Sequence, residues 1–366
     1  MKKIVMTGGG TSGHVTPNIA LIPELKALGY HIEYIGSKNG MEKQLIEAEG
    51  IPYHSISTGK LRRYFSLENF ADAFRVMGGL TQSVSLMRKI RPDIVFSKGG
   101  FVSCPVVWAA WLCGIPVVIH ESDITPGLTN KLSMPFARKV CYTFPESKSH
   151  IPQEKGVLTG IPIRKSLLEG NRAEGRMICG FEDNKPTLLV IGGSQGAVRI
   201  NEAVRKSLGR LMKDFNICHI CGKGNVDDQY RSVKGYKQFE YIREELPHLF
   251  ALADIVVSRA GATTLFELLA LKKPSLLIPL SRQASRGDQI LNAESFRKQG
   301  FSMVLPEEEL TPDTLADRAK TLFENRQEYR KAMERSGRTN GTREVVRVIE
   351  ETYQLKHARR GEGLES

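Results

Sequence analysis

Two glycine-rich segments, residues 8–13 (GGGTSG) and 192–196 (GGSQG), each follow a short apolar run and precede a helical pattern. A strand, a glycine-rich turn and a helix in this order present backbone N–H groups and the positive end of the helix dipole to a phosphate. Elsewhere, apolar runs bounded by turn residues alternate with helical patterns, which is typical of parallel sheets covered on both faces. We therefore expect an α/β enzyme with two Rossmann-like domains and a nucleotide-linked substrate.

The length of 366 residues exceeds the size at which one hydrophobic core keeps growing, so two domains are expected. After Arg164 the chain is rich in glycine and charge, and the strand–turn–helix pattern restarts at residue 187. We place the first domain at residues 1–163 and the second at 164–341. The last helix, residues 342–357, is expected to pack back on the first domain.

The charge balance favours an anionic partner, because 52 Lys and Arg stand against 40 Asp and Glu, a net charge of +12. No basic run is interleaved with aromatic residues, so nucleic acid is not an expected partner. The six cysteines show no framework spacing, which fits a reducing compartment. The N-terminal segment MKKIVMTGGG lacks the apolar stretch of a signal peptide, so we expect a cytoplasmic location.

The first turn also satisfies a dinucleotide fingerprint through Gly8, Gly10 and Gly13, with Glu33 twenty residues further on. An NAD(P)-dependent oxidoreductase is therefore an alternative. Three features disfavour this alternative. The strand continues past Glu33, and His14 lies where its side chain would be too close to a bound dinucleotide. A second loop of the same kind also follows later in the chain.

Seven segments together resemble the MurG family, in glycosyltransferase family 28. They are GGTSGHVTP (9–17), SKGGFVSCP (97–105), IPVVIHESDITPGLTNK (115–131), GIPIR (160–164), GGSQGA (192–197), SRAGATTLFE (258–267) and GDQILNA (287–293). The resemblance implies a GT-B fold with a cleft between two Rossmann-like domains. It also implies transfer of GlcNAc from UDP-GlcNAc to the C4 hydroxyl of lipid-linked MurNAc-pentapeptide, the step from lipid I to lipid II in peptidoglycan synthesis.

Such an enzyme would be peripheral, at the cytoplasmic face of the bacterial cell membrane. Its expected partners are UDP-GlcNAc, the lipid-linked acceptor, an anionic inner-leaflet surface and other cell-wall synthesis proteins. Two alternatives remain open: a related GT-B transferase with another lipid acceptor, such as diacylglycerol, and a UDP-sugar sensor without catalysis.

An inverting displacement needs a base and a site for the leaving diphosphate. His14, at the start of the first helix, is the leading base candidate, because imidazole titrates near neutral pH. Asp123 and Glu121 are the rival acids. Backbone N–H groups of Ser194 and Gln195, with the Arg164 guanidinium, are expected to hold the diphosphate. With no DxD sequence, no metal or cofactor is expected to be required, although Mg²⁺ remains an option as a loose activator.

The resemblance implies the remaining donor contacts. Glu267 would accept both ribose hydroxyls, Ile242 would contact uracil through its backbone, and Gln289 would read sugar hydroxyls. The other residues implied for UDP-GlcNAc are Thr11, Ser12, Gly13, His14, Asp123, Ala262, Thr263, Thr264 and Asp288. This chain departs from common family residues at Ser12, Phe101, Asp123 and Asp288, which leaves the role of Asp123, base or binder, open.

A helical stripe of apolar residues at 67, 70, 74, 77, 80, 84 and 87 ends at Pro92, with basic residues at both ends. The basic residues are Lys60, Arg62, Arg63, Arg75, Arg88, Lys89 and Arg91. The stripe either faces the core or, together with the KLRR segment at residues 60–63, docks on acidic lipid.

Overall fold

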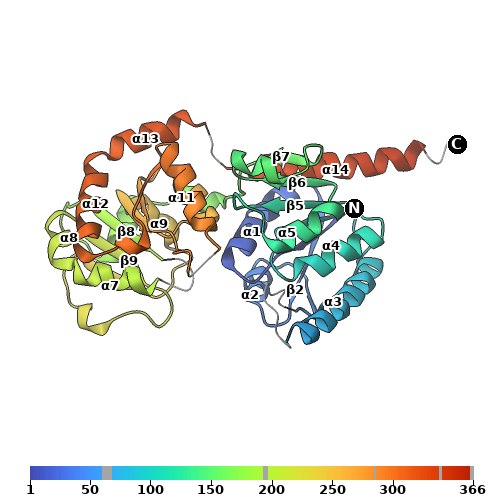
Figure 1. The fold of residues 1–366 in the computed structure, drawn as a ribbon, viewed down its shortest axis with the longest axis horizontal. Helices are drawn as coiled ribbons and strands as arrows, with labels where there is room; N and C mark the ends of the chain where they lie inside the picture. Colours follow the sequence, from blue (N-terminus) through green and yellow to red (C-terminus); the bar gives the residue numbers. More distant parts are fainter. Residues whose placement is uncertain (60–67, 193–196, 284–285, 338–339, 363–366) are drawn as a thin grey trace. The chain divides into compact units, whose positions relative to one another are not determined.

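The computed structural model describes residues 1–59, 68–192, 197–283, 286–337 and 340–362 (Figure 1). The chain divides into two compact units. The first contains Met1–Arg164 and Asn340–Ser366, and the second contains Lys165–Thr339. Each unit has its own sheet, helices and core, and each is described by itself.

The first unit is built on a parallel sheet of seven strands in the order β3-β2-β1-β4-β5-β6-β7. Its central strands are buried apolar runs such as IVFS in β4, because helices cover both faces. The strands are β1 (Lys2–Thr7), β2 (Tyr30–Ser37), β3 (Tyr53–Ile56), β4 (Ile94–Ser97), β5 (Val117–Glu121), β6 (Lys139–Tyr142) and β7 (Gly156–Leu158). The sequence patterns did not predict β3.

Helices cover the two faces of this sheet in two separate packing clusters. One cluster joins the sheet to α1 and α14, where Val345 and Ile349 are buried with Leu21 and Leu25. The other joins it to α3 and α4. The helices are α1 (Ser12–Ala27), α2 (Met41–Ala48), α3 (Glu68–Ile90), α4 (Ser103–Leu112), α5 (Leu128–Ser133) and α14 (Thr342–Glu362).

The C-terminal segment is fixed to the first unit by Asn340. Its amide donates to Ile163 O at 2.7 Å and accepts from Ile163 N at 2.9 Å. It also caps the chain just before α14, since Asn340 Oδ1 accepts from Thr342 N at 2.9 Å. Figure 1 shows α14, in red, beside β6 and β7 of this unit.

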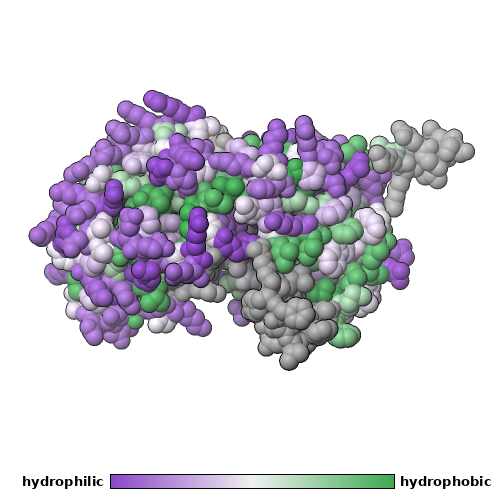
Figure 2. Space-filling model, viewed as in Figure 1, coloured by the Kyte–Doolittle hydropathy of each residue, from purple (hydrophilic) through white to green (hydrophobic). Residues whose placement is uncertain are grey.

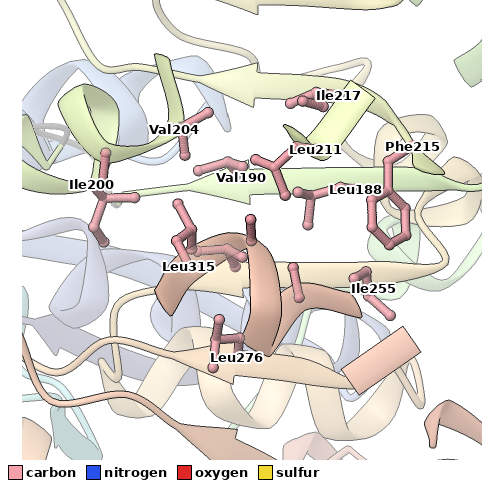
Figure 3. Close-up of a cluster of buried hydrophobic side chains, with 14 of the residues drawn as sticks. Leu188, Val190, Ile200, Val204, Leu211, Phe215, Ile217, Ile255, Leu276 and Leu315 are labelled. Atoms are coloured by element: carbon pink, nitrogen blue, oxygen red, sulfur yellow. The ribbon is translucent and has the colours of Figure 1, made fainter. Parts of the chain in front are cut away.

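The second unit is built on a parallel sheet of six strands in the order β10-β9-β8-β11-β12-β13. Its core is formed by strand residues such as Leu188 and Ile217 with Ile200 of α7 and Leu315 of α12 (Figure 3). The strands are β8 (Thr187–Ile191), β9 (Asn216–Ile220), β10 (Tyr236–Phe239), β11 (Ile255–Ser258), β12 (Ser275–Leu277) and β13 (Ser302–Val304).

Eight α-helices of the second unit flank this sheet: α6 (Arg172–Cys179), α7 (Val198–Lys206), α8 (Leu208–Asp214), α9 (Leu246–Leu252), α10 (Ala262–Ala270), α11 (Asp288–Lys298), α12 (Pro312–Glu324) and α13 (Arg326–Arg335), counted over the described residues. Thr311 caps α12 through a capping box with Thr314. β10 ends at Phe239, so Ile242, the residue expected to contact uracil, lies in the segment beyond this strand.

Both sheets have a topological switch point, between β1 and β4 in the first and between β8 and β11 in the second. Chain connections leave in opposite directions there, which opens a crevice at the carboxyl ends of the strands where ligands of such sheets bind. Each glycine-rich turn of the sequence follows the first strand of its switch point. No helix in the described part of the chain is long and apolar enough to cross a membrane.

Candidate active site

Three turns meet at the carboxyl edge of the first sheet, one each after β1, β4 and β5. Gly9 N donates to Gly99 O at 3.3 Å, which joins the first two turns. A Cβ on Gly100, whose φ is +87°, would come within 2.1 Å of Gly9 O. Glycine is therefore required at Gly100 both by its left-handed conformation and by the close approach of the two backbones.

His14 lies in the first turn of α1, half-buried. Its Nδ1 is 3.1 Å from Gly9 O and 3.0 Å from Thr11 Oγ1. Because a carbonyl oxygen only accepts, the contact with Gly9 places the proton on Nδ1 and leaves Nε2 as the nitrogen that can accept another. Thr11 is the exposed residue that precedes α1, and Ser12 and Gly13 begin the helix.

Glu42 of α2 forms a hydrogen bond with the glycine-rich turn that carries His14. It is fully buried, and its carboxylate accepts from Ser37 N at 3.1 Å and from Gly10 N at 3.3 Å. The Ser37 hydroxyl donates to the same carboxylate. This buried anion therefore joins the end of β2 to the turn that carries His14.

The two rival acids have different surroundings. Glu121, at the end of β5, is 4% exposed, and its oxygens accept from Asp123 N at 2.9 Å, Gly127 N at 3.0 Å and Asn130 Nδ2 at 2.8 Å. Asp123 is half-buried on the turn that these bonds shape. Glu121 thus organises the turn, and Asp123 is the acid with a partly exposed side chain.

Lys98 was not among the residues predicted from the sequence. It follows β4 directly and is 1% exposed, and its ammonium donates to the Ser122 hydroxyl. Burial lowers the pKa of Lys98 to about 8, an effect that the negative charges of Glu121 and Asp123 oppose. A charged residue immediately after a buried strand is the signal by which the sequence could have revealed Lys98.

A polar cavity of about 700 Å³ lies in the first unit beside this edge. Phe101 connects the two, because it lines the cavity and its ring packs on Gly10, where a Cβ would be 2.8 Å from Cε1. Two exposed cations, Lys38 and Arg75, also line the cavity.

In the second unit, Gly192 follows β8 and α7 starts at Val198. Ser194 and Gln195, the predicted diphosphate donors, lie outside the described residues. Arg164, at the end of the first unit, is half-buried, and its Nε has no hydrogen-bond partner among the described residues. The Arg164 guanidinium is therefore chemically suited to an anion.

The first turn of α10 brings together Ala262, Thr263 and Thr264 after Gly261. Glu267 lies one turn later on the same helix and is 9% exposed. A buried carboxylate close to a helix N-terminus is suited to accepting hydrogen bonds from a diol, because both of its oxygens accept.

Gln289 of α11 joins two turns of the second sheet. Its Oε1 accepts from Ala260 N at 3.3 Å and from Leu280 N at 3.1 Å. The neighbouring Asp288 pairs with Arg286 at 2.9 Å, and its Oδ1 is buried without a hydrogen-bond partner in the described structure. The carbonyl end of Gln289 is thus structural, and its amide nitrogen is the end suited to a ligand.

A buried ion pair underlies the turn after β11. Arg259 Nη2 donates to Glu307 Oε1 at 2.5 Å, and Nη1 donates to Ile278 O at 3.1 Å. Sequence reasoning did not single out this pair, because Glu307 lies 48 residues away in an acidic run that is typical of a solvated surface. No group of three or more potential metal ligands occurs in the described part of the chain.

Two parallel sheets, each with a topological switch point, form the architecture of the GT-B fold. Residues 4–142 match the glycosyltransferase family 28 N-terminal domain and residues 187–349 match the family's C-terminal domain. The chain therefore belongs to glycosyltransferase family 28.

Similar proteins agree with this assignment. A UDP-N-acetylglucosamine–N-acetylmuramyl-(pentapeptide) pyrophosphoryl-undecaprenol N-acetylglucosamine transferase from Clostridium botulinum strain Hall is 60% identical over 95% of this chain and 99% of its own. A protein of the same name from Clostridium tetani is 56% identical over 97% of this chain and 99% of its own. The crystal structure of MurG from Acinetobacter baumannii matches 96% of this chain and 100% of its own, with 26% identity and a TM-score of 0.74.

Proposed function

We propose that this chain transfers GlcNAc from UDP-GlcNAc to the C4 hydroxyl of MurNAc-pentapeptide-pyrophosphoryl-undecaprenol. The identity with relatives of that name supports the substrates. The observation that carries the chemistry is the hydrogen bond from His14 Nδ1 to Gly9 O, because it leaves Nε2 able to accept a proton.

In the proposed step the acceptor oxygen attacks the anomeric carbon, and the bond from this carbon to the diphosphate oxygen breaks. UDP leaves with that electron pair, the hydroxyl proton passes to His14 Nε2, and the configuration inverts. Asp123 is assigned to hold the acceptor or donor sugar beside His14. Glu121, whose oxygens already accept three hydrogen bonds, is assigned to hold the turn.

The donor is assigned to the second unit. The N-terminal end of α7 and the Arg164 guanidinium would balance the charge of the leaving diphosphate. Glu267 would accept the ribose hydroxyls, and the Gln289 amide would donate to the sugar. We propose that Mg²⁺ is at most a loose activator, so transfer should persist in EDTA.

The acceptor is assigned to the first unit, and the cavity beside Phe101 gives it a place. The acceptor carries a pyrophosphoryl group and a peptide, both anionic, and Lys38 and Arg75 supply positive charge in that cavity. Phe101, which lines the cavity, packs on Gly10 in the turn that carries His14, so an acceptor bound in the cavity would have its reacting hydroxyl near that turn.

The membrane surface is assigned to the outer face of α3, α4 and α5. Phe74, Met77, Trp111 and Leu112 are 54–77% exposed there. Figure 2 shows hydrophobic residues gathered over these helices. The predicted stripe on α3 is divided. Phe74 and Met77 are exposed, whereas Leu80, Val84 and Met87 pack on the sheet. Lys60, Arg62 and Arg63 lie outside the described residues.

This face is proposed to dock on the anionic cytoplasmic leaflet. Trp111→Ser together with Phe74→Ser should weaken binding to phosphatidylglycerol vesicles, whereas Met177→Ser, an equally exposed apolar site in the second unit, should not. Equal binding by all three proteins would contradict the docking face.

The oxidoreductase alternative is disfavoured by Glu33. The residue lies inside β2, and its carboxylate pairs with His54 Nε2 at 2.6 Å and His31 Nε2 at 3.5 Å, which occupies the group that would bind a ribose. Thermal shift measurements test the donor class directly. UDP-GlcNAc should raise the melting temperature more than UDP-glucose, and NADH should leave it unchanged. Stabilisation by NADH alone would contradict the proposal.

A further inference from the structure

Lys98 is buried at the active-site edge, and the proposed mechanism gives it no role. Removing an ammonium from water costs several kcal/mol unless nearby charges and hydrogen bonds compensate. Methionine would avoid that cost, but it would also remove the positive charge. A lysine at this position therefore calls for an explanation in terms of that charge.

The surroundings of Lys98 come from three elements. β5 provides His120 and Glu121, and the turn after it provides Ser122 and Asp123. On the α1 side, the space beside Gly8 is closed by the His14 carbonyl, the Asn18 amide and Lys98 Cβ, all within 3.1 Å of where a Gly8 Cβ would lie.

The ammonium contacts the turn at its centre. Its hydrogen bond goes to Ser122, the residue between the two acids. Glu121 faces backbone N–H groups and Asn130, so its orientation is already fixed. The Asp123 carboxylate, on the other side of Ser122, also attracts the ammonium, so Lys98 acts on this turn through one hydrogen bond and two negative charges.

We propose that Lys98 is a positioning residue for glycosyl transfer. Its ammonium holds the turn at residues 121–123 through Ser122 and, by its charge, holds the Asp123 carboxylate in place for the contact with the acceptor or donor sugar. This inference rests on the proposed function. It makes the protonation of Lys98 a condition for full activity, although Lys98 itself does not contact the reacting atoms.

The titration of Lys98 gives the inference a distinct signature. Burial lowers the pKa of Lys98 to about 8, so the ammonium prevails at pH 7 and is lost as the pH rises through 8. The charged neighbours that face it are Glu121 and Asp123, which favour the ammonium, while buried His120 is held neutral by its own lowered pKa. The wild-type kcat/KM for the acceptor should therefore fall on the alkaline side with a midpoint near pH 8.

The test compares kcat/KM from pH 6 to 9.5 for wild type, Lys98→Arg and Lys98→Met, with Lys139→Met as a control on β6 of the same sheet. Arginine stays charged in this range, so Lys98→Arg should move the alkaline limb beyond pH 9. Lys98→Met should lower kcat/KM by about 10-fold or more at pH 7 and abolish the limb. The inference would be overturned if the alkaline decrease in kcat/KM had the same midpoint in all four proteins, whatever their absolute rates.

A second measurement needs no Lys98 variant to fold well. Lysine side chains labelled with ¹³C at Cε are titrated by NMR in wild type and in Asp123→Asn. Two lysines should titrate near pH 8 in wild type, because burial lowers the pKa of Lys98 and of Lys273 to about 8. In Asp123→Asn the midpoint of Lys98 should fall, because the variant removes a charge that favours the ammonium, while Lys273 in the second unit should keep its midpoint. Unchanged midpoints for both lysines would overturn the inference. A wild-type protein without transfer activity would instead contradict the proposed function, and the NMR comparison would still test the coupling.

Discussion

His14 Nδ1 lies 3.1 Å from the carbonyl oxygen of Gly9, five residues earlier in the same glycine-rich turn. The shape of the turn thus determines which ring nitrogen carries the proton. Gly9 in turn contacts Gly99 after β4. The first glycine-rich turn is therefore suited to presenting a base, whereas in a dinucleotide-binding protein the same sequence pattern presents N–H groups to a diphosphate.

Removing the imidazole should affect catalysis far more than binding. His14→Ala should lower kcat by about 10²–10⁴-fold, the usual contribution of a general base. The KM for UDP-GlcNAc should change less than about threefold, since the base acts mainly in the transition state. Steady-state kinetics measure both, with exposed His150→Ala as the control. Turnover within a few-fold of wild type in His14→Ala would remove His14 as the base.

Glu42 should be more important for stability than its position on a surface helix suggests. Glu42→Ala leaves Ser37 N and Gly10 N without their acceptor, and should lower the free energy of unfolding by about 2–3 kcal/mol, the range for hydrogen bonds to charged groups. Glu47→Ala, on the exposed side of the same helix, should change it by less than about 0.5 kcal/mol. Urea denaturation compares them, and equal stabilities would contradict the role of Glu42.

Glu267 should control recognition of the donor ribose. Glu267→Gln should raise the KM for UDP-GlcNAc by about 10-fold or more, because a charged acceptor for the two hydroxyls becomes neutral. The variant should also discriminate less against a donor whose ribose lacks its 2′-hydroxyl. Glu294→Gln, at a partly exposed residue of α11 that pairs with Arg297, is the control. An unchanged preference for the intact ribose would contradict this assignment.

Lys38 should affect the acceptor and leave the donor alone. In detergent micelles without anionic lipid, Lys38→Ala should raise the KM for the lipid-linked acceptor about 3- to 10-fold, the loss of one charge-assisted contact. The KM for UDP-GlcNAc should be unchanged. Lys43→Ala, on α2 and absent from the lining of the cavity, is the matched control. A rise in the donor KM instead would place the cavity in donor binding.

The second unit should lose stability in mild acid because of His219. This imidazole is buried between Tyr236 and Asn201, and burial lowers its pKa to about 3. Below the ordinary value of 6.5 the unfolded chain binds a proton that the folded unit does not. The free energy of unfolding should therefore fall by about 1.4 kcal/mol per pH unit between pH 6 and 4 from this group.

The quantity to measure is the change in the free energy of unfolding per pH unit. His219→Gln should reduce the pH dependence by about one proton over this range, whatever its effect on stability at pH 7. His150→Gln, exposed in the first unit, should keep the wild-type slope. Equal slopes for wild type and His219→Gln would show that His219 is protonated in the folded unit.

Much of the fold could be predicted from the sequence because strands buried on both faces are continuous apolar runs. β4 and β8 are examples, and the glycine-rich turns mark where helices begin. β3 was missed because it is a short edge strand, YHSI, whose His54 and Ser55 are partly exposed. Its pairing with β2 is a tertiary contact that a local pattern does not record.

Only those site residues that lie in recognisable sequence motifs could be predicted from the sequence. His14 and Glu267 fall in recognisable turns, so their positions followed from the motifs. Lys98 and Glu42 did not, because a lysine after a strand and a glutamate on a helix usually face water. Their partners, Ser122 and Gly10, lie 24 and 32 residues away, and only the folded sheet brings them together.

The central claim is tested most directly by incubating the protein with UDP-GlcNAc labelled in the sugar and MurNAc-pentapeptide-pyrophosphoryl-undecaprenol, then measuring label in the lipid phase against UDP released. The account predicts one labelled GlcNAc in the lipid product for each UDP. UDP-GlcNAc binding without transfer, or transfer to diacylglycerol and not to the muramoyl lipid, would contradict it.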